Sequence, residues 1–231
     1  MRILYTASEA LPYAASGGLA DVAGSLPAAL CKAGHDCRVV LPLYKSIKPE
    51  LRKDLRFLMN FTVDVGWRKQ YCGVFEGHAN NVTYYLLDNE YYYARDGLYG
   101  FYDDCERFVF LSRAVMELIR HIDWKPQIIN CNDWQTALVP VYYQTYYKYQ
   151  HGYEDIKTVF TIHNIQYQGK YGMDVLNEVM GIPMYHANLL EYDGCINMMK
   201  GAFETADKIT TVSPSYAWEI LDPWYAHGLD R

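Results

Sequence analysis

The feature that most constrains the fold of this sequence is an alternation of short apolar runs with segments of helical periodicity. RILYTAS (2–8) is an apolar run, and it is followed by a glycine turn and a helical pattern that continues to Lys32. AGHDCRVVLP (33–42) adds a glycine stop and a second apolar run. Together these segments predict a β-turn-α-turn-β unit, the beginning of an open, mainly parallel sheet.

The same alternation continues along the chain. Residues 60–88 differ, because two strand-like segments flank Asn80-Asn81, a natural hairpin turn, and so predict an antiparallel excursion. No repeat, linker or low-complexity stretch divides residues 1–231, which are expected to form one α/β domain with a Rossmann-like, doubly wound sheet. The remaining expected strands are 125–133, 156–164 and 209–213, and the expected helices are 103–122, 134 to about 149, 192–208 and one that begins at Pro214.

Composition narrows the class of protein. Of the 231 residues, 51% are hydrophobic and 21% charged, which is typical of a soluble globular protein. A net charge of −6 argues against nonspecific nucleic-acid binding, and no long apolar span predicts membrane insertion. Glu9 and Pro12 interrupt any apolar core of a signal peptide, and the six cysteines are scattered without a C-x-x-C pair. We therefore expect a cytoplasmic protein with reduced thiols.

Polar residues directly follow four of the expected strands. They occur in the segments 8–19, 130–135, 161–169 and 213–215. In doubly wound sheets, ligands bind at the carboxyl ends of the strands near the topological switch point. The four segments therefore predict one shared cleft.

Gly17-Gly18 opens the first expected helix. The backbone N–H groups of such a loop can cradle a phosphate, and Asp21, one helical turn on, could bind a hydroxyl. The alternative is that the two glycines only permit close packing of the helix on a strand. No positive charge lies in Ala14–Ser16, and a fuller phosphate-binding pattern is missing.

Two further segments carry candidate binding groups. Asp133 lies at a strand-to-helix junction, where it could cap the helix, contact a ligand, or do both. His163 and Asn164 end another strand, and Gln168 belongs to the cluster of amide and phenol groups that follows. Dense neutral donors and acceptors suit a hydroxyl-rich ligand, whereas an isolated histidine is more often structural.

Two tyrosine-rich segments allow more than one interpretation. In the loop 88–100, Arg95 could face a phosphate or carboxylate, or the loop could simply be stabilised by ring packing. Tyr142 to Tyr147 form an i,i+4 stripe that predicts a buried core or a protein-docking face. No nucleophilic triad, metal cluster or nearby carboxylate pair can be assembled, so a hydrolase or metalloenzyme has little support.

Taken together, the segments resemble the N-terminal catalytic domain of the bacterial glycogen synthase and plant starch synthase family. The match is collinear over nearly the whole chain, which is more specific than any single motif. The matching stretches are SEALPYAASGGLADVAGSLPAAL, GHDCRVVLPLY, YARDGLYG, DDCERFVFLSRA, NDWQTALVP, FTIHNIQYQG and ADKITTVSPSYAWEI.

The resemblance implies one half of a GT-B glycosyltransferase that transfers glucose from ADP-glucose to the non-reducing end of an α-1,4-glucan with retention, without a metal or other cofactor. It places Gly17 and Gly18 against the donor diphosphate and implies catalytic roles for Asp133 and His163, with His163 bonded to the transferred glucose. The positions it implies for substrate binding also include Asp21, Tyr93 and Asn164; the sequence adds Arg95 and Gln168.

Three departures from the family pattern bear on activity. Ala15 occupies the lysine position of the K-x-G-G-L motif, and Asn130 stands where the family usually has a histidine. The family also continues into a C-terminal nucleotide-binding domain, which this chain lacks, so we expect the isolated domain to be inactive or nearly so. The alternatives are a noncatalytic glucan-binding or regulatory module of the same fold and a structural partner that docks through Tyr142–Tyr147.

Overall fold

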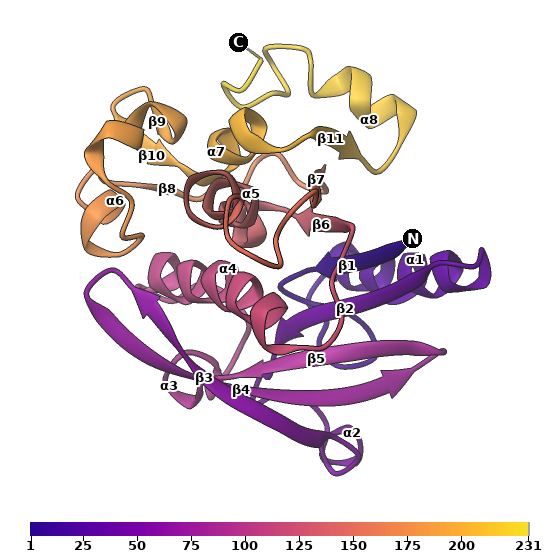
Figure 1. The fold of residues 1–231 in the computed structure, drawn as a ribbon. Helices are drawn as coiled ribbons and strands as arrows, with labels where there is room; N and C mark the ends of the chain where they lie inside the picture. The colour runs from indigo at the N-terminus through magenta and orange to yellow at the C-terminus, as the bar shows by residue number, and fades with distance from the viewer. Residues whose placement is uncertain (231) are drawn as a thin grey trace.

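The computed structural model describes residues 1–230, in which eight strands form one sheet. The strand order is β11-β7-β6-β1-β2-β5-β4-β3 (Figure 1). Six neighbouring strands, from β11 to β5, run parallel, and β4 and β3 continue the sheet in antiparallel fashion. The strands are β1 (Arg2–Thr6), β2 (Asp36–Pro42), β3 (Arg56–Val65), β4 (Arg68–Ala79), β5 (Val82–Asp88), β6 (Ile128–Asn132), β7 (Lys157–Ile162) and β11 (Lys208–Thr211).

The sheet order reverses between β1 and β6. The chain proceeds from β1 outward to β2, reaches the far edge of the sheet at β3 and returns through β4 to β5. It then crosses back to β6 and proceeds the other way through β7 to β11. Right-handed crossovers in opposite directions place their helices on opposite faces, and Figure 1 shows α1 (Gly18–Lys32) and α4 (Asp104–His121) in this arrangement. The expected doubly wound, mainly parallel sheet is confirmed, with its switch point between β1 and β6.

Shorter helices complete the domain. The expected helix from residue 134 to about 149 is divided into a 3₁₀ turn η1 (Trp134–Thr136), α5 (Leu138–Tyr142) and a π-helical segment η2 (Tyr143–Tyr147). Proline begins α8 (Pro214–Glu219), as expected. The other short helices are α2 (Pro49–Arg52), α3 (Glu90–Tyr93), α6 (Val175–Glu178), η3 (Met184–Leu189) and α7 (Met198–Thr205).

The antiparallel excursion is confirmed. Ala79 pairs with Val82, which leaves Asn80 and Asn81 as a two-residue loop with φ of 51° and 62°. A two-residue loop with positive φ at both positions matches the right-handed twist of the two strands that it joins. Asparagine tolerates that conformation better than most side chains. The asparagine pair therefore determines where β4 turns into β5.

The expectation of one helix over 192–208 is wrong in its first part. A small sheet forms there from β8 (Lys170–Tyr171), β9 (Glu191–Tyr192) and β10 (Cys195–Asn197). The helix begins only at Met198, where the Asn197 side chain accepts a hydrogen bond from the backbone of Lys200. Asp193-Gly194, with φ of 52° and 79°, is the two-residue turn of this hairpin.

The tyrosine stripe belongs to the core. Tyr142, Tyr143 and Tyr147 are buried, and the Arg113 guanidinium carbon lies 4.8 Å from the ring centroid of Tyr142 and 5.0 Å from that of Tyr146. Such cation–π contacts compensate for the burial of a charge. Because its rings already pack inside the domain, the stripe is not a docking face.

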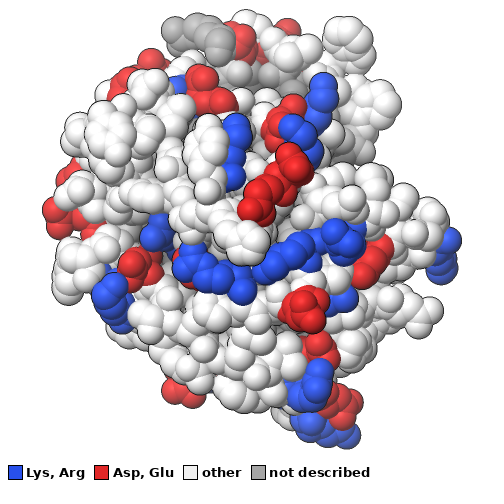
Figure 2. Space-filling model, in the orientation of Figure 1, with Lys and Arg blue, Asp and Glu red and all other residues white. Residues whose placement is uncertain are grey.

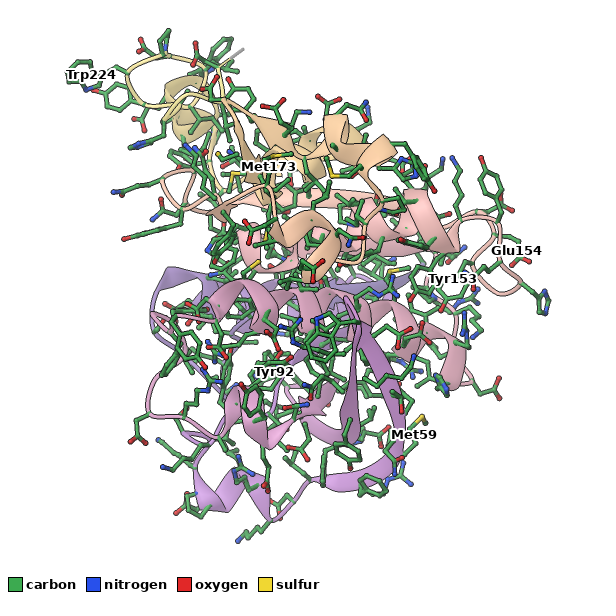
Figure 3. The ribbon with its side chains drawn as sticks, turned by 90° about the vertical axis from the view of Figure 1, so that its left-hand side faces the viewer. Met59, Tyr92, Tyr153, Glu154, Met173 and Trp224 are labelled. Atoms are coloured by element: carbon green, nitrogen blue, oxygen red, sulfur yellow. The ribbon has the colours of Figure 1, made fainter. Side chains whose placement is uncertain are left out.

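The surface mixes charge signs. On the face shown in Figure 2, a band of Lys and Arg crosses the middle and acidic side chains flank it. Figure 3 shows Tyr92 inside the domain and Trp224 directed outward from the C-terminal segment, where 84% of its surface is exposed. Across residues 1–230, the helices lack the combination of length and apolar character that crossing a bilayer requires.

The turn between β3 and β4 generates a stability prediction. Gly66 has φ of 57°, and a Cβ atom there would overlap the backbone carbonyl of Glu178, which also accepts a hydrogen bond from Arg68 at 3.1 Å. Gly66→Ala is expected to lower the free energy of unfolding by about 3 kcal/mol or more, because strain and steric overlap add. Urea denaturation measures the change.

Gly34→Ala is the matched control. Gly34 has φ of 89°, but an added Cβ meets no atom within 4 Å. The loss there is limited to backbone strain, about 1–2 kcal/mol. Equal losses for the two variants would show that contact with Glu178 contributes nothing.

Candidate functional site

A cleft of about 930 Å³ opens at the carboxyl ends of β1, β6, β7 and β11, beside the switch point of the sheet. All four predicted segments contribute to it or border it. The position of the cleft therefore agrees with the prediction of one site shared by the four segments. Its lining residues are Glu9, Ser16, Gly17, Gly18, Leu19, Val22, Tyr99, Gly100, Asp104, Asp133, Trp134, Gln135, His163, Asn164, Tyr167 and Val212.

The glycine loop presents open backbone to this cleft. Gly17 is the N-cap residue of α1 and provides no side-chain cap. A Cβ atom at Gly18 would meet nothing within 4 Å, and one at Gly17 would meet only Glu9 Oε1 at 3.9 Å. The interpretation that the glycines serve close internal packing is therefore wrong. The glycines instead leave the positive end of the α1 dipole accessible from the cleft.

Glu9, which the sequence analysis did not single out, shapes this loop from within. Its side chain is buried, and Oε2 accepts hydrogen bonds from the backbone N–H of Ser16 at 2.7 Å and from the Ser16 hydroxyl at 2.6 Å. Ala15, the residue before Ser16, is exposed. The signal for Glu9 was a carboxylate three residues after β1, the strand that leads into the glycine turn.

Asp133 organises the opposite side of the cleft. Its Oδ1 accepts hydrogen bonds from the backbone N–H groups of His163 at 2.7 Å and Asn164 at 3.1 Å, and it makes no helix-cap contact. Burial raises the pKa of Asp133 to about 6, although the two N–H donors oppose the rise, and nearby Glu9 adds to it. The backbone at Asp133 has φ of 56° and ψ of −178°, a strained combination that is found almost exclusively at glycine. The carboxylate thus connects β6 to the loop after β7.

The proton position on His163 follows from its neighbours. Asn132 Nδ2 lies 2.9 Å from the Thr6 carbonyl and 2.8 Å from Asn130 Oδ1, so this nitrogen donates and Oδ1 must accept. His163 Nε2, 2.8 Å from Asn132 Oδ1, therefore carries the proton, and Nδ1 keeps the lone pair. Burial lowers the pKa of His163 to about 4, so the ring is neutral at neutral pH.

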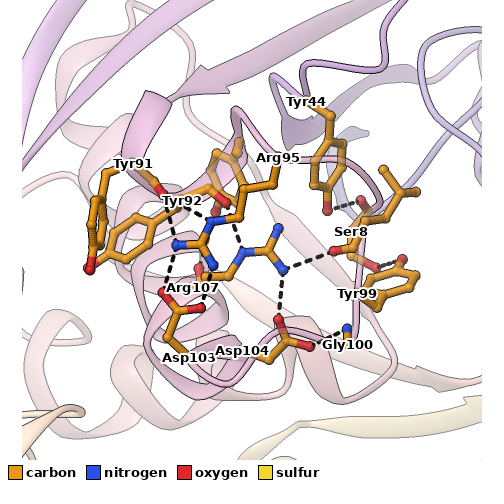
Figure 4. Close-up of polar contacts among 12 residues, drawn as sticks. Ser8, Tyr44, Tyr91, Tyr92, Arg95, Tyr99, Gly100, Asp103, Asp104 and Arg107 are labelled. Atoms are coloured by element: carbon orange, nitrogen blue, oxygen red, sulfur yellow. Dashed lines mark hydrogen bonds and ion pairs between the residues drawn. The ribbon is translucent and has the colours of Figure 1, made fainter.

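Tyr93 and Arg95 do not belong to the cleft lining. Tyr93 is fully buried, and its hydroxyl donates to the Arg107 carbonyl at 3.1 Å. The Arg95 guanidinium is paired with Asp103, with Nη2 to Oδ2 at 2.7 Å, and it also donates to the Tyr91 carbonyl (Figure 4). An arginine held this way has its donors committed within the protein and does not face a phosphate.

The other sequence candidates divide in the same way. Asn164 lines the cleft, whereas Asp21 is exposed in the first turn of α1 and lies outside the lining. Gln168 is buried away from the lining, and its carboxamide bonds to Asn197 and to the Ile165 carbonyl. The structure therefore brings together Gly17, Gly18, Asp133, His163 and Asn164.

A buried guanidinium holds one wall of the cleft. Arg107 donates to the Asp104 carboxylate at 2.7 Å and to the carbonyls of Tyr92 at 2.8 Å and Leu98 at 2.9 Å (Figure 4). Asp104 in turn accepts the backbone N–H of Gly100 at 2.8 Å. Both Asp104 and Gly100 line the cleft, and neither was predicted. The sequence signal for Asp104 was the pair of carboxylates, Asp103-Asp104, at the start of the expected helix 103–122.

The sheet order and the cleft at its switch point define a Rossmann-like α/β domain, and its structural match is to one half of a GT-B fold. The catalytic domain of starch synthase IV from Arabidopsis thaliana, solved with ADP and acarbose bound, superposes with a TM-score of 0.89 at 30% identity, over 98% of this chain and 48% of that one. Sucrose-phosphate synthase from Thermosynechococcus elongatus shares the fold, with a TM-score of 0.54 at 14% identity over 97% of this chain and 45% of that one.

The chain belongs to the starch synthase catalytic domain family, whose profile matches residues 2–231. The glycogen synthase of Clostridium botulinum strain Alaska E43 is 51% identical over all of this chain and 49% of its own length. That of Geobacillus stearothermophilus is 46% identical over all of this chain and 48% of its own length. The chain thus spans about half the length of the curated relatives it matches.

The raised pKa of Asp133 generates a pH prediction. Folding raises this pKa from 3.8 to about 6, so the folded protein loses stability as the pH rises through that interval. Asp133→Asn keeps the Oδ1 acceptor and removes the charge. The variant is expected to exceed the natural protein in free energy of unfolding by up to about 3 kcal/mol at pH 7.5, with the difference vanishing near pH 4.

Urea denaturation at both pH values measures this difference, and Asp193→Asn provides the control. Asp193 also has a positive φ, of 52°, but is exposed. Its replacement should change stability by a similar small amount at both pH values. A pH-independent effect of Asp133→Asn would contradict the assignment of a buried, ionised carboxylate.

Proposed function

We propose that this chain provides one wall of the catalytic cleft of a retaining glucosyltransferase. The enzyme would transfer glucose from ADP-glucose to the non-reducing end of an α-1,4-glucan, and a second, nucleotide-binding domain would provide the opposite wall. Family membership supports the reaction class, and the starch synthase IV structure that resembles this chain carries ADP and acarbose. The observation that carries the proposal is the open glycine backbone at the start of α1, across the same cleft from Asp133 and His163.

The cleft divides into two chemical regions. At Gly17 and Gly18, backbone N–H groups and the helix dipole suit a diphosphate. At His163 and Asn164, neutral donors and acceptors suit sugar hydroxyls. A nucleotide sugar carries both kinds of group, whereas a phosphate or a simple sugar alone uses only one region.

His163 and Asp133 have different roles in this proposal. The neutral imidazole, held through Nε2 by Asn132, orients a glucosyl hydroxyl with its free acceptor Nδ1. Asp133 holds the His163 and Asn164 backbone in place, and its negative charge stabilises the positive charge that develops at the anomeric carbon. This chemistry needs positioning and electrostatics from the chain, with no metal.

The charge of the cleft limits what this chain does alone. Its described lining holds the carboxylates Glu9, Asp104 and Asp133 but neither lysine nor arginine. A diphosphate is therefore bound here through backbone dipoles against unfavourable carboxylate charge. We expect little or no ADP release when the 231-residue chain is incubated with ADP-glucose and glycogen; turnover at ordinary enzyme rates would contradict this.

The exposed Ala15 supports a second candidate function. It stands beside the glycine loop without a charge, where the family motif has lysine. A domain that no longer needs to hold a diphosphate could act as a noncatalytic glucan-binding or regulatory module. Strong retention in glycogen affinity electrophoresis without any response to ADP would favour that module over the enzyme half.

Gly18→Ala tests the donor site directly. The added methyl group meets no protein atom within 4 Å but enters the cleft wall, where it would hinder a diphosphate. ADP affinity, measured by calorimetric titration, is expected to fall about tenfold, which corresponds to about 1.4 kcal/mol. Thermal stability should stay unchanged or rise, because alanine is a better helix former than glycine. Unchanged ADP affinity would remove the main support for the proposed function.

Ala15→Lys tests the altered motif. A lysine beside the diphosphate contributes a charge-assisted hydrogen bond of about 1.5–3 kcal/mol, so ADP affinity should rise by roughly one to two powers of ten. The control is Ala29→Lys, which adds the same charge at an exposed position of α1, the helix that follows the glycine loop. An equal gain in both variants would indicate net charge rather than a specific contact.

A further inference from the structure

Two buried glutamines near the cleft have opposite hydrogen-bonding states. Gln168, 3% exposed, is fully engaged: Nε2 donates to the carbonyls of Ile165 at 3.0 Å and His227 at 3.2 Å, and Oε1 accepts from Asn197 at 2.8 Å. Gln135, 9% exposed, lines the cleft. Its Oε1 is buried and accepts no hydrogen bond from any group among residues 1–230.

The backbone holds Gln135 firmly in place. It lies in η1, where the Thr136 hydroxyl accepts from the Asn132 N–H at 2.6 Å and the Thr136 N–H donates to the Asp133 carbonyl at 3.1 Å. The Ser112 hydroxyl donates to the carbonyl of Gln135 itself at 3.5 Å. These contacts fix the position of the Gln135 backbone at the edge of the cleft.

An unpaired buried acceptor destabilises the protein that carries it. Buried side-chain oxygens are nearly always hydrogen-bonded, because desolvation without a partner is unfavourable. An apolar side chain of similar size would avoid this penalty at position 135. The carboxamide is therefore best explained by a hydrogen-bond donor that arrives with a ligand of the cleft.

The surroundings disfavour a donor that carries negative charge. A carboxamide oxygen only accepts, so it repels phosphate oxygens, and the lining carboxylates Glu9, Asp104 and Asp133 oppose a further anion. A sugar hydroxyl donates without bringing charge. We propose that Gln135 accepts a hydrogen bond from a hydroxyl of the glucosyl unit bound in the cleft and thereby contributes to sugar specificity. This inference rests on the proposed function.

Gln135→Met tests this assignment with two opposite expectations. Removal of the unpaired oxygen should raise the melting temperature of the 231-residue chain by about 2 °C or more. The same change should weaken the binding of maltotriose, followed by NMR titration, by about five- to tenfold. ADP affinity, measured on the same samples, should stay within about twofold of the natural protein, because the diphosphate region is unaffected.

Gln168→Met is the matched control for the stability effect. It removes a glutamine whose hydrogen bonds are all made, and it should lower the melting temperature by several degrees, about 4 °C or more. A comparable fall for Gln135→Met would overturn the proposal by showing that its oxygen is satisfied in the free protein.

The two ligands separate this proposal from the proposed function. The role of Gln135 is overturned if maltotriose binds Gln135→Met as tightly as it binds the natural chain. It is also overturned if maltotriose does not bind the natural chain. Either result holds even where ADP binding supports a donor site. If Gln135→Met weakens maltotriose binding while ADP fails to bind the natural chain, the sugar contact stands and the donor function loses its support.

Discussion

The buried Arg107 guanidinium is the interaction on which the shape of the cleft most depends. It joins the first turn of α4 to the tyrosine-rich loop through the Asp104 carboxylate and two loop carbonyls, and the rings of Phe101 and Phe108 lie over it at 4.7 and 5.3 Å. The loss of any of these partners would leave a buried charge less compensated and would destabilise the fold. The loop is therefore a fixed wall of the cleft, and the positions of Tyr99 and Gly100 follow from it.

The parts of the structure that were predictable from sequence are those determined by local pattern. Apolar runs alternating with helical periodicity require a layered α/β sheet, and the handedness of the crossovers then brings the carboxyl ends of the strands to one edge. That edge contains Gly17, Asp133 and His163, each of which directly follows a strand or precedes a helix. Their approach to one another is a consequence of topology, which is why it could be predicted from the order of segments alone.

The parts that sequence reasoning missed depend on which partner each polar group finds. Gln135 and Gln168 both follow a strand in a polar segment, so the sequence does not distinguish them. In the structure, Gln168 is hydrogen-bonded to Asn197 and Ile165, whereas Gln135 Oε1 has no partner among the described residues. Arg95 similarly depends on a carboxylate eight residues away. The error over 192–208 is different in kind, because Asp193-Gly194 is a recognisable hairpin signal that helical periodicity in the later residues obscured.

The positive-φ backbone at Asp133 has a consequence for how this cleft can change during evolution. With φ of 56° and ψ of −178°, the residue has a conformation that is found almost exclusively at glycine. Glycine is reached from either aspartate codon by a single base change, and it carries no charge. Neutral drift at this position therefore leads most readily to descendants that keep the strand-to-turn geometry and lose the carboxylate. A lineage could in this way exchange catalysis for simple binding without any visible alteration of its architecture.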